Sequence, residues 1–295
     1  MMSRTKMLGG IALAAAAALT LSGCAGGAGT PGGRSIDIAV FNGWDEGIAA
    51  SYLWQSILED KGYKVKLTYA DVAPVYEGLS RGNFDVVLDT WLPTTHADYL
   101  ERYRGKVEDL GAWNDDARLT VAVNADAPID SLDQLAGAAD QFGGRIVGIE
   151  PGSGLMRVTA EDVVPGYGLG SLDLVESSTP AMLAELKKAT DAGQDIAVTL
   201  WRPHWAYNAF PLKDLADPKG LLGAAESIHS VASTSLATDH PEVHDWISNF
   251  TMPGDKLASL EDAMFNAYDG DDYAPVVKQW IADNREWVDS LTAAR

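Results

Sequence analysis

Strand-like and helix-like patterns of apolar residues alternate along the chain from Ser35 onward. The segment 64–69 alternates apolar and polar side chains, which is typical of a half-buried strand. The segment 47–61 has the apolar spacing of a helix, and Gly62 follows it at the position that a terminating glycine prefers. Because strands and helices take turns in this way, we expect a largely parallel sheet covered by helices.

The alternation repeats in two units. In the first unit we expect strands at 36–41, 64–69 and 84–88 and helices at 47–61 and 75–80. A strand at 119–123 precedes the second unit, for which we expect strands at 145–149, 172–175 and 195–200 and helices at 131–135, 155–164 and 180–190. From Pro241 to the end the pattern is mostly helical.

Two α/β units of this size suit a ligand trap in which two lobes close by a hinge motion over a cleft. We place the hinge near 119–124, with the chain returning near 227–234. The predicted lobes are therefore residues 35–119 plus 231–295 for lobe 1 and residues 120–230 for lobe 2.

The first residues have the layout of an export signal. Two basic residues precede an apolar run at 7–21, and small residues then lead to Cys24. We predict a signal peptide at 1–23 and a flexible tether at 24–34, which is rich in glycine and alanine. Cys24 is the only cysteine of the 295 residues, so an intramolecular disulfide is excluded.

The segment Leu21-Ser22-Gly23-Cys24 resembles the bacterial lipobox. This resemblance implies that Cys24 receives lipid and holds the protein at the extracytoplasmic face of the cell membrane. The alternative is a free cysteine beside the cleavage site of a soluble protein.

The charge of the chain argues against one class of partner. The formal net charge is −20, and no basic cluster interrupts it. Nucleic acid is therefore not expected as a partner. The acidity would weakly attract cationic solutes, but it does not define a site.

Four segments follow predicted strands at their carboxyl ends, where open α/β sheets bind ligands. They are residues 43–47, 90–96, 151–155 and 200–205. Three of them contain a tryptophan, namely Trp44, Trp91 and Trp201. Several indole faces around one volume form a cage for a quaternary ammonium group. The alternative is that these tryptophans only fill the interface between the lobes, which would suit one such residue better than three.

The fourth segment contains the turn Gly152-Ser153-Gly154, which opens a predicted helix. Free backbone N–H groups and the helix dipole make such a turn attractive to an anion. The alternative is an ordinary helix start that Ser153 caps. A nucleotide-binding loop is excluded because no Gly-Lys-Ser/Thr follows.

The five histidines do not form a recognisable catalytic or metal site. His240 and His244 flank Glu242 at a spacing that faintly resembles a metal motif. Pro241 and Glu242 suit a helix start better, so we expect no metal and no cofactor. No nucleophile, base and acid stand in a recognisable arrangement, so we do not expect an enzyme. His96 lies five positions past the second loop tryptophan, near a predicted helix start.

Four stretches together resemble the substrate-binding proteins of glycine betaine and proline betaine ABC importers. They are Gly43-Trp44-Asp45-Glu46-Gly47, Trp91-Leu92-Pro93-Thr94-Thr95-His96, residues 148–156 and residues 198–205. The resemblance runs from about Ser35 to the C-terminus. It implies an α/β fold of the two-lobed type II periplasmic-binding-protein class with the ligand cleft between the lobes. It also implies permease and ATPase subunits as partners.

The resemblance further implies roles for six residues. The trimethylammonium group would lie in a prism of Trp44, Trp91 and Trp201. The ligand carboxylate would meet the His96 side chain and the backbone N–H groups of Gly154 and Leu155. Many relatives have isoleucine in place of Leu155, and a main-chain contact tolerates that difference.

The family leaves the exact ligand open. Related choline binders share the two lobes and the aromatic cage, so a choline or carnitine receptor stays an alternative. An amino-acid receptor would need an acid for the ammonium group. Asp45 and Glu46 are available for this, although both suit a helix start better.

Overall fold

The computed structural model describes residues 34–270 and 272–293. The predicted signal peptide, Cys24 and all of the predicted tether except Arg34 lie outside the described residues. Within the described ranges, no helix is long and apolar enough to cross a membrane.

The strands form one mixed sheet in the order β2-β1-β3-β9-β4-β7-β5-β6, with β8 paired to β4. Their bounds are β1 (Ser35–Phe41), β2 (Lys64–Ala70), β3 (Val86–Leu92), β4 (Val107–Asn124), β5 (Arg145–Val147), β6 (Asp173–Val175), β7 (Ala197–Arg202), β8 (Leu212–Asp214) and β9 (Glu226–Ser233). We call β1, β2, β3 and their helices the first half, and β5 to β8 and their helices the second half.

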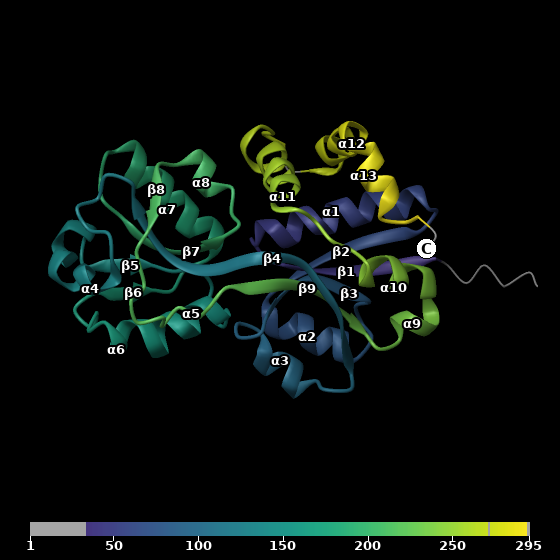
Figure 1. Cartoon of the computed structure of the whole chain (residues 1–295), viewed down its shortest axis with the longest axis horizontal. Coiled ribbons are helices and arrows are strands. Elements are labelled where there is room, and N and C mark those ends of the chain that lie inside the picture. Colours follow the sequence, from purple (N-terminus) through teal and green to yellow (C-terminus); the bar gives the residue numbers. More distant parts are fainter. Residues whose placement is uncertain (1–33, 271, 294–295) are drawn as a thin grey trace, which may run out of the picture. The chain divides into compact units, whose positions relative to one another are not determined.

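Helices cover the strands of both halves. The first half has α1 (Asp45–Asp60), α2 (Val72–Ser80), α3 (Ala97–Arg102), α9 (Leu236–Asp239), α10 (Pro241–Ser248), α11 (Gly254–Glu261), α12 (Ala274–Asp283) and α13 (Arg285–Ser290). The second half has α4 (Leu132–Leu135), α5 (Gly154–Val158), α6 (Val164–Gly166), α7 (Thr179–Asp191) and α8 (Ala206–Ala209). In Figure 1, α1, α11 and α12 lie on one side of the first-half strands, and α2 and α3 lie on the other.

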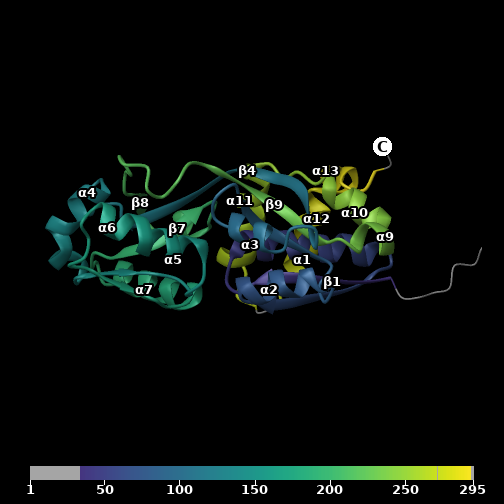
Figure 2. The same ribbon diagram turned by 90° about the horizontal axis from the view of Figure 1, so that it is seen from below.

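The predicted parallel arrangement is confirmed within each half. β1 pairs in parallel with β2 and β3, and β5 pairs in parallel with β6 and β7. Between them, β4 and β9 run antiparallel to each other and to their outer neighbours. Figure 2 shows β4 extending from the first half into the second. The hinge in this region stays a prediction.

Several elements differ in extent from the expected ones. A strand was expected only at 119–123, but β4 begins at Val107 because β9 pairs with it from there despite the polar run 114–116. The strand expected at 84–88 is β3, whose pairing with β9 continues to Leu92. The helix expected at 155–164 is interrupted by a π-helical turn at Thr159–Val163. The pattern did not indicate β8, β9 or α8, whereas α3 begins at Ala97, beside His96, where a helix start was expected.

Local signals place the two helix starts nearest the site. The helix α1 begins at Asp45, with Asp45 and Glu46 in its first turn, where negative charge is favoured. This confirms the expected helix start. The helix α5 begins at Gly154, and the Ser153 hydroxyl caps it by accepting from the Met156 N–H at 3.3 Å. Both starts lie beside the carboxyl ends of strands.

Candidate functional site

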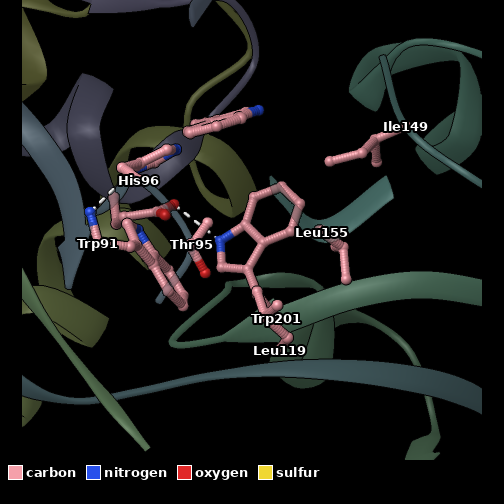
Figure 3. Close-up of a pocket in the computed structure, with 9 residues that line it drawn as sticks. Trp91, Thr95, His96, Leu119, Ile149, Leu155 and Trp201 are labelled. Atoms are coloured by element: carbon pink, nitrogen blue, oxygen red, sulfur yellow. Dashed lines mark hydrogen bonds between the residues drawn. The ribbon is translucent and has the colours of Figure 1, made fainter. Parts of the chain in front are cut away.

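One cavity is lined by most of the residues that the sequence singled out. The space between its lining atoms, open solvent included, is about 270 Å³. Figure 3 shows Trp91, Thr95 and His96 on one side of this space and Trp201, Leu155 and Ile149 on the other. The complete lining is Trp44, Glu46, Trp91, Thr95, His96, Leu119, Ile149, Leu155 and Trp201.

Trp44 reaches the cavity from the turn between β1 and α1. Gly43 has a φ of 77°, a left-handed conformation that glycine adopts without strain, and Trp44 is then the N-cap of α1. The indole packs edge-on against Phe41 at 4.8 Å between ring centroids. It stacks on the His96 ring at 5.5 Å. Its N–H donates to the Glu150 carboxylate, which lies in the second half.

Trp91 and Trp201 lie on strands rather than in the loops where the sequence placed them. Each is the penultimate residue of its strand, in β3 and β7, because both strands end later in the chain than expected. The indole N–H of Trp91 donates to Asp89 at 2.9 Å, and the indole N–H of Trp201 donates to Glu46 at 2.9 Å. The rings of Trp44 and Trp201 are 6.3 Å apart. We call Trp44, Trp91 and Trp201 the cage tryptophans.

His96 presents one unpaired nitrogen. Its Nδ1 accepts from the backbone N–H of Trp91 at 2.9 Å, and its Nε2 is buried without a hydrogen-bond partner among the described residues. Burial, and then the positive charge of Arg157, lowers the pKa of His96 to about 3. The ring is therefore neutral at ordinary pH, and its proton is on Nε2. The donor that His96 offers is a neutral imidazole N–H, not an imidazolium.

Gly154 and Leu155 lie where α5 meets the segment after β3. A Cβ on Gly154 would come within 2.4 Å of Thr95 Cγ2 and 2.6 Å of the Thr95 carbonyl oxygen, so only glycine allows this approach. The Leu155 side chain is buried and lines the cavity. The first-turn N–H groups of a helix have no intrahelical acceptor, so those of Gly154 and Leu155 are available to a ligand.

Thr95 was quoted within a motif, but its position at the cavity was not predicted. Glu226 of β9 accepts from the backbone N–H groups of Thr94 and Thr95 at 2.8 and 2.9 Å, and from the Thr95 hydroxyl. These bonds fix the segment that precedes His96. Because Glu226 is far along the chain, no local pattern could indicate this pairing.

Four buried carboxyl groups lie beside the cage, and we call them the acid cluster. They are Asp45, Glu46, Asp89 and Glu261. Burial raises the pKa of Asp45 and of Asp89 to about 7. Burial, and then the negative charges of Asp89 and Glu261, raises the pKa of Glu46 well above its usual value. Sequence reasoning treated two of these acids as helix-start residues and missed the other two.

The remaining tryptophans have mostly structural positions. Trp54 is fully buried in α1, and Trp280 is buried in α12, so both pack in the core. Trp205 does not line the cavity, and its N–H donates to Asp45.

Pro241 begins α10, which confirms the helix start expected there. Within residues 34–270 and 272–293, no group of three or more potential metal ligands is found.

The comparison with protein families decides the class of this chain. The family described as the substrate-binding domain of ABC-type glycine betaine transport systems matches residues 34–283. The chain belongs to this family. It is a family of transport proteins, and its match covers nearly all of the described residues.

Individual relatives agree with the family. The glycine betaine/carnitine transport binding protein GbuC of Listeria monocytogenes is 33% identical over 171 residues, which is 56% of this chain and 55% of that protein. The chain thus spans about half the length of this curated relative.

Two solved structures are similar over most of the chain. Lactococcal OpuAC, closed around glycine betaine, is 30% identical with a TM-score of 0.80, covering 88% of this chain and 99% of that one. An ABC-transporter choline-binding protein with choline is 26% identical with a TM-score of 0.80, covering 88% and 91%. These matches confirm the predicted α/β fold of two-lobed periplasmic binding proteins.

Proposed function

We propose that this family member is the extracytoplasmic substrate-binding protein of an ABC importer, and that it captures glycine betaine or a closely related quaternary ammonium solute. One observation carries the proposal. The three cage tryptophans line a single small cavity together with His96, whose buried Nε2–H has no partner among the described residues. Such a cavity is suited to a ligand with an apolar cation at one end and an acceptor at the other.

The cation end is recognised by the indole faces. A trimethylammonium group has no N–H donor, so hydrogen bonds cannot recognise it, whereas ring faces attract it. Each desolvated contact contributes about 2 kcal/mol, so three give about 6 kcal/mol. Carboxylates hold the indole N–H groups of Trp44, Trp91 and Trp201, which fixes the orientation of the rings.

The carboxylate end is recognised by three N–H donors. These are the His96 Nε2–H and the backbone N–H groups of Gly154 and Leu155. Hydrogen bonds to a charged acceptor contribute about 1.5–3 kcal/mol each, so with the cage contacts the sum exceeds the roughly −8 kcal/mol of a micromolar complex, and the excess offsets the freedom lost on binding. The proposed activity is capture without catalysis, because apart from Thr95 and the neutral His96 the cavity is lined by indoles, apolar side chains and Glu46, which already accepts from an indole N–H.

The wider assembly follows from the same proposal. Cys24 would carry the lipid that anchors the protein at the extracytoplasmic face of the membrane. Permease subunits would receive the ligand, and ATPase subunits would drive its transport. The two lobes, residues 35–119 plus 231–295 and residues 120–230, would close over the ligand by bending in β4 and β9.

A choline or carnitine receptor is the second candidate, and one observation favours it. Glu46 lines the cavity beside the cage tryptophans, and a carboxylate there attracts choline, a cation that, unlike carnitine, has no acid of its own. The similar structure that contains choline gives this candidate a precedent within the same fold.

Calorimetric titration of the purified protein with glycine betaine, proline betaine, carnitine and choline tests the proposal. We expect a betaine to bind with micromolar or tighter affinity, and proton NMR of the recovered ligand to show it unchanged. If choline saturates the protein at equal or lower concentration than either betaine, the second candidate replaces the first. If none of the four binds, both are wrong.

A further inference from the structure

Three hydrogen bonds beside the cavity join the first half to the second, and we call them the bridging bonds. The Trp44 N–H donates to Glu150, the Trp201 N–H to Glu46 and the Trp205 N–H to Asp45. The first half supplies the donor of one bond, Trp44. The second half supplies the donors of the other two bonds. Any motion that separates the halves breaks all three bonds together.

Two of the acceptors belong to the acid cluster, which lies in the first half. Glu46 is 1% exposed and Asp89 is 1% exposed. The Oδ2 atom of Asp89 and the Oε1 atom of Glu261 are buried without a hydrogen-bond partner among the described residues. The chain thus holds more carboxyl oxygens at this place than its own donors satisfy.

Positive side chains lie near the cluster but do not pair with it: Arg118 and Arg202 line a neighbouring cavity together with Glu261, and Arg202 pairs with Asp214. The members of the cluster come from α1, β3 and α11, and the groups that face Asp45 and Glu46 from the second half are two indole N–H groups and His204. Burial lowers the pKa of His204 to about 3, so this ring is neutral although its Nε2 lies 3.6 Å from Asp45. In the part of the chain that the structure describes, no lysine or arginine forms an ion pair with any of the four acids.

We propose that the acid cluster makes approach of the two halves conditional on a cationic ligand, and that Glu46 is the residue that selects for ligand charge. The inference rests on the proposed function, because it places the ligand cation in the cavity that Glu46 lines. Bringing the halves together removes Glu46 and Asp45 from water, which is unfavourable for a carboxylate without a nearby cation. A cation between the cage tryptophans supplies the missing charge and stabilises the closed arrangement together with the bridging bonds.

Selection of this kind acts on charge rather than on shape. A ligand shifts a conformational equilibrium only by its differential affinity for the two states. A tert-butyl group has nearly the size and shape of trimethylammonium and fills the same cage, but it leaves the acid cluster uncompensated. Glu46 differs from the other three acids because it contacts the cavity and also accepts from the Trp201 N–H. The Glu46 side chain therefore takes part in closure, in the geometry of the cage and in the recognition of ligand charge.

The test compares two ligands of matched shape. Glycine betaine and tert-butylacetate both carry the carboxylate, and only the first carries the positive charge. Each is titrated by calorimetry into the wild type, into Glu46→Gln and into the control Asp98→Asn. The side chain introduced by Glu46→Gln keeps an amide oxygen to accept from the Trp201 N–H, whereas Asp98 is an exposed acid of α3 outside the cavity.

We expect the wild type to prefer glycine betaine by about a hundredfold or more, and Glu46→Gln to reduce this preference by about tenfold. The reduction should come from weaker betaine binding with tert-butylacetate binding unchanged or improved. The Asp98→Asn control should keep the wild-type preference. Asp89→Asn is a second variant, which keeps an acceptor for the Trp91 N–H, and it should reduce the preference in the same direction.

An unchanged preference in both variants would overturn the inference. Equal weakening of the two ligands in Glu46→Gln would also overturn it, because Glu46 would then act only by positioning the Trp201 ring. These outcomes are distinct from a failure of the proposed function. In that case the wild type itself would not bind glycine betaine.

Discussion

Replacing His96 separates recognition of the carboxylate from recognition of the cation. The ring is fully buried, and its Nδ1 already accepts from the backbone N–H of Trp91, so a variant must keep an acceptor for that N–H. We choose His96→Asn, because the asparagine Oδ1 can take the place of Nδ1, while no atom reaches the place of Nε2. His96→Ala is less selective, because it leaves the backbone N–H of Trp91 without its acceptor and also removes a ring that stacks on Trp44.

The magnitude follows from the charge of the acceptor. A hydrogen bond to a carboxylate contributes about 1.5–3 kcal/mol, so its loss should weaken glycine betaine roughly 10- to 150-fold. A hydrogen bond to the neutral hydroxyl of choline contributes about 0.5–1.5 kcal/mol, or roughly 2- to 10-fold. The preference for glycine betaine over choline should therefore shrink by about tenfold in His96→Asn.

Calorimetric titration of both ligands into the wild type and His96→Asn measures this preference. Circular dichroism melting of the unliganded proteins is the control for folding. The reasoning is refuted if the variant is folded and still binds glycine betaine with the wild-type affinity. It is also refuted if both ligands weaken by the same factor, because His96 would then support the cage rather than bind the carboxylate.

Four further predictions concern the cage, the helix start, the anchor and pH. Substituting any one cage tryptophan by alanine should weaken glycine betaine at least about tenfold in calorimetry, and normal binding by two such variants would mean that the cage is misplaced. Gly154→Ala should weaken binding similarly, since its Cβ would displace α5 from Thr95, and a titration equal to the wild type would contradict this. Cys24→Ala should move the protein from the membrane fraction of cells to the soluble fraction. A Cys24→Ala variant that stays in the membrane fraction would contradict this. Because burial raises the pKa of Asp45 and Asp89 to about 7 and a bound cation favours their ionised forms, betaine affinity should fall as pH drops from about 8 to about 6. An affinity for glycine betaine that is unchanged or rises as the pH falls over this range would be evidence against it.

Much of the fold could be predicted because its signals are local. The alternation of apolar residues located β1, β2 and α1 within a few residues of their bounds. It failed for β9 and for most of β4, because pairing between these two strands holds them in extended form whatever their side chains are. A sequence pattern reports side-chain burial, and it carries no direct information about backbone pairing with a distant segment.

The candidate site was predictable only in part, for the same reason. The cage tryptophans, His96 and Leu155 stand in local motifs, and the structure brings them to one cavity. The pairing of Glu226 with Thr94 and Thr95, and the meeting of Asp89 with Glu261 beside α1, depend on how separate elements pack. Which of these residues bind a ligand stays a prediction.

A crystal structure of the protein with glycine betaine tests the central claim most directly. The account predicts the trimethylammonium group between Trp44, Trp91 and Trp201, with the carboxylate within hydrogen-bond distance of the His96 Nε2 and of the Gly154 and Leu155 N–H groups. A ligand bound outside this cavity, or one whose carboxylate points away from His96, would contradict it.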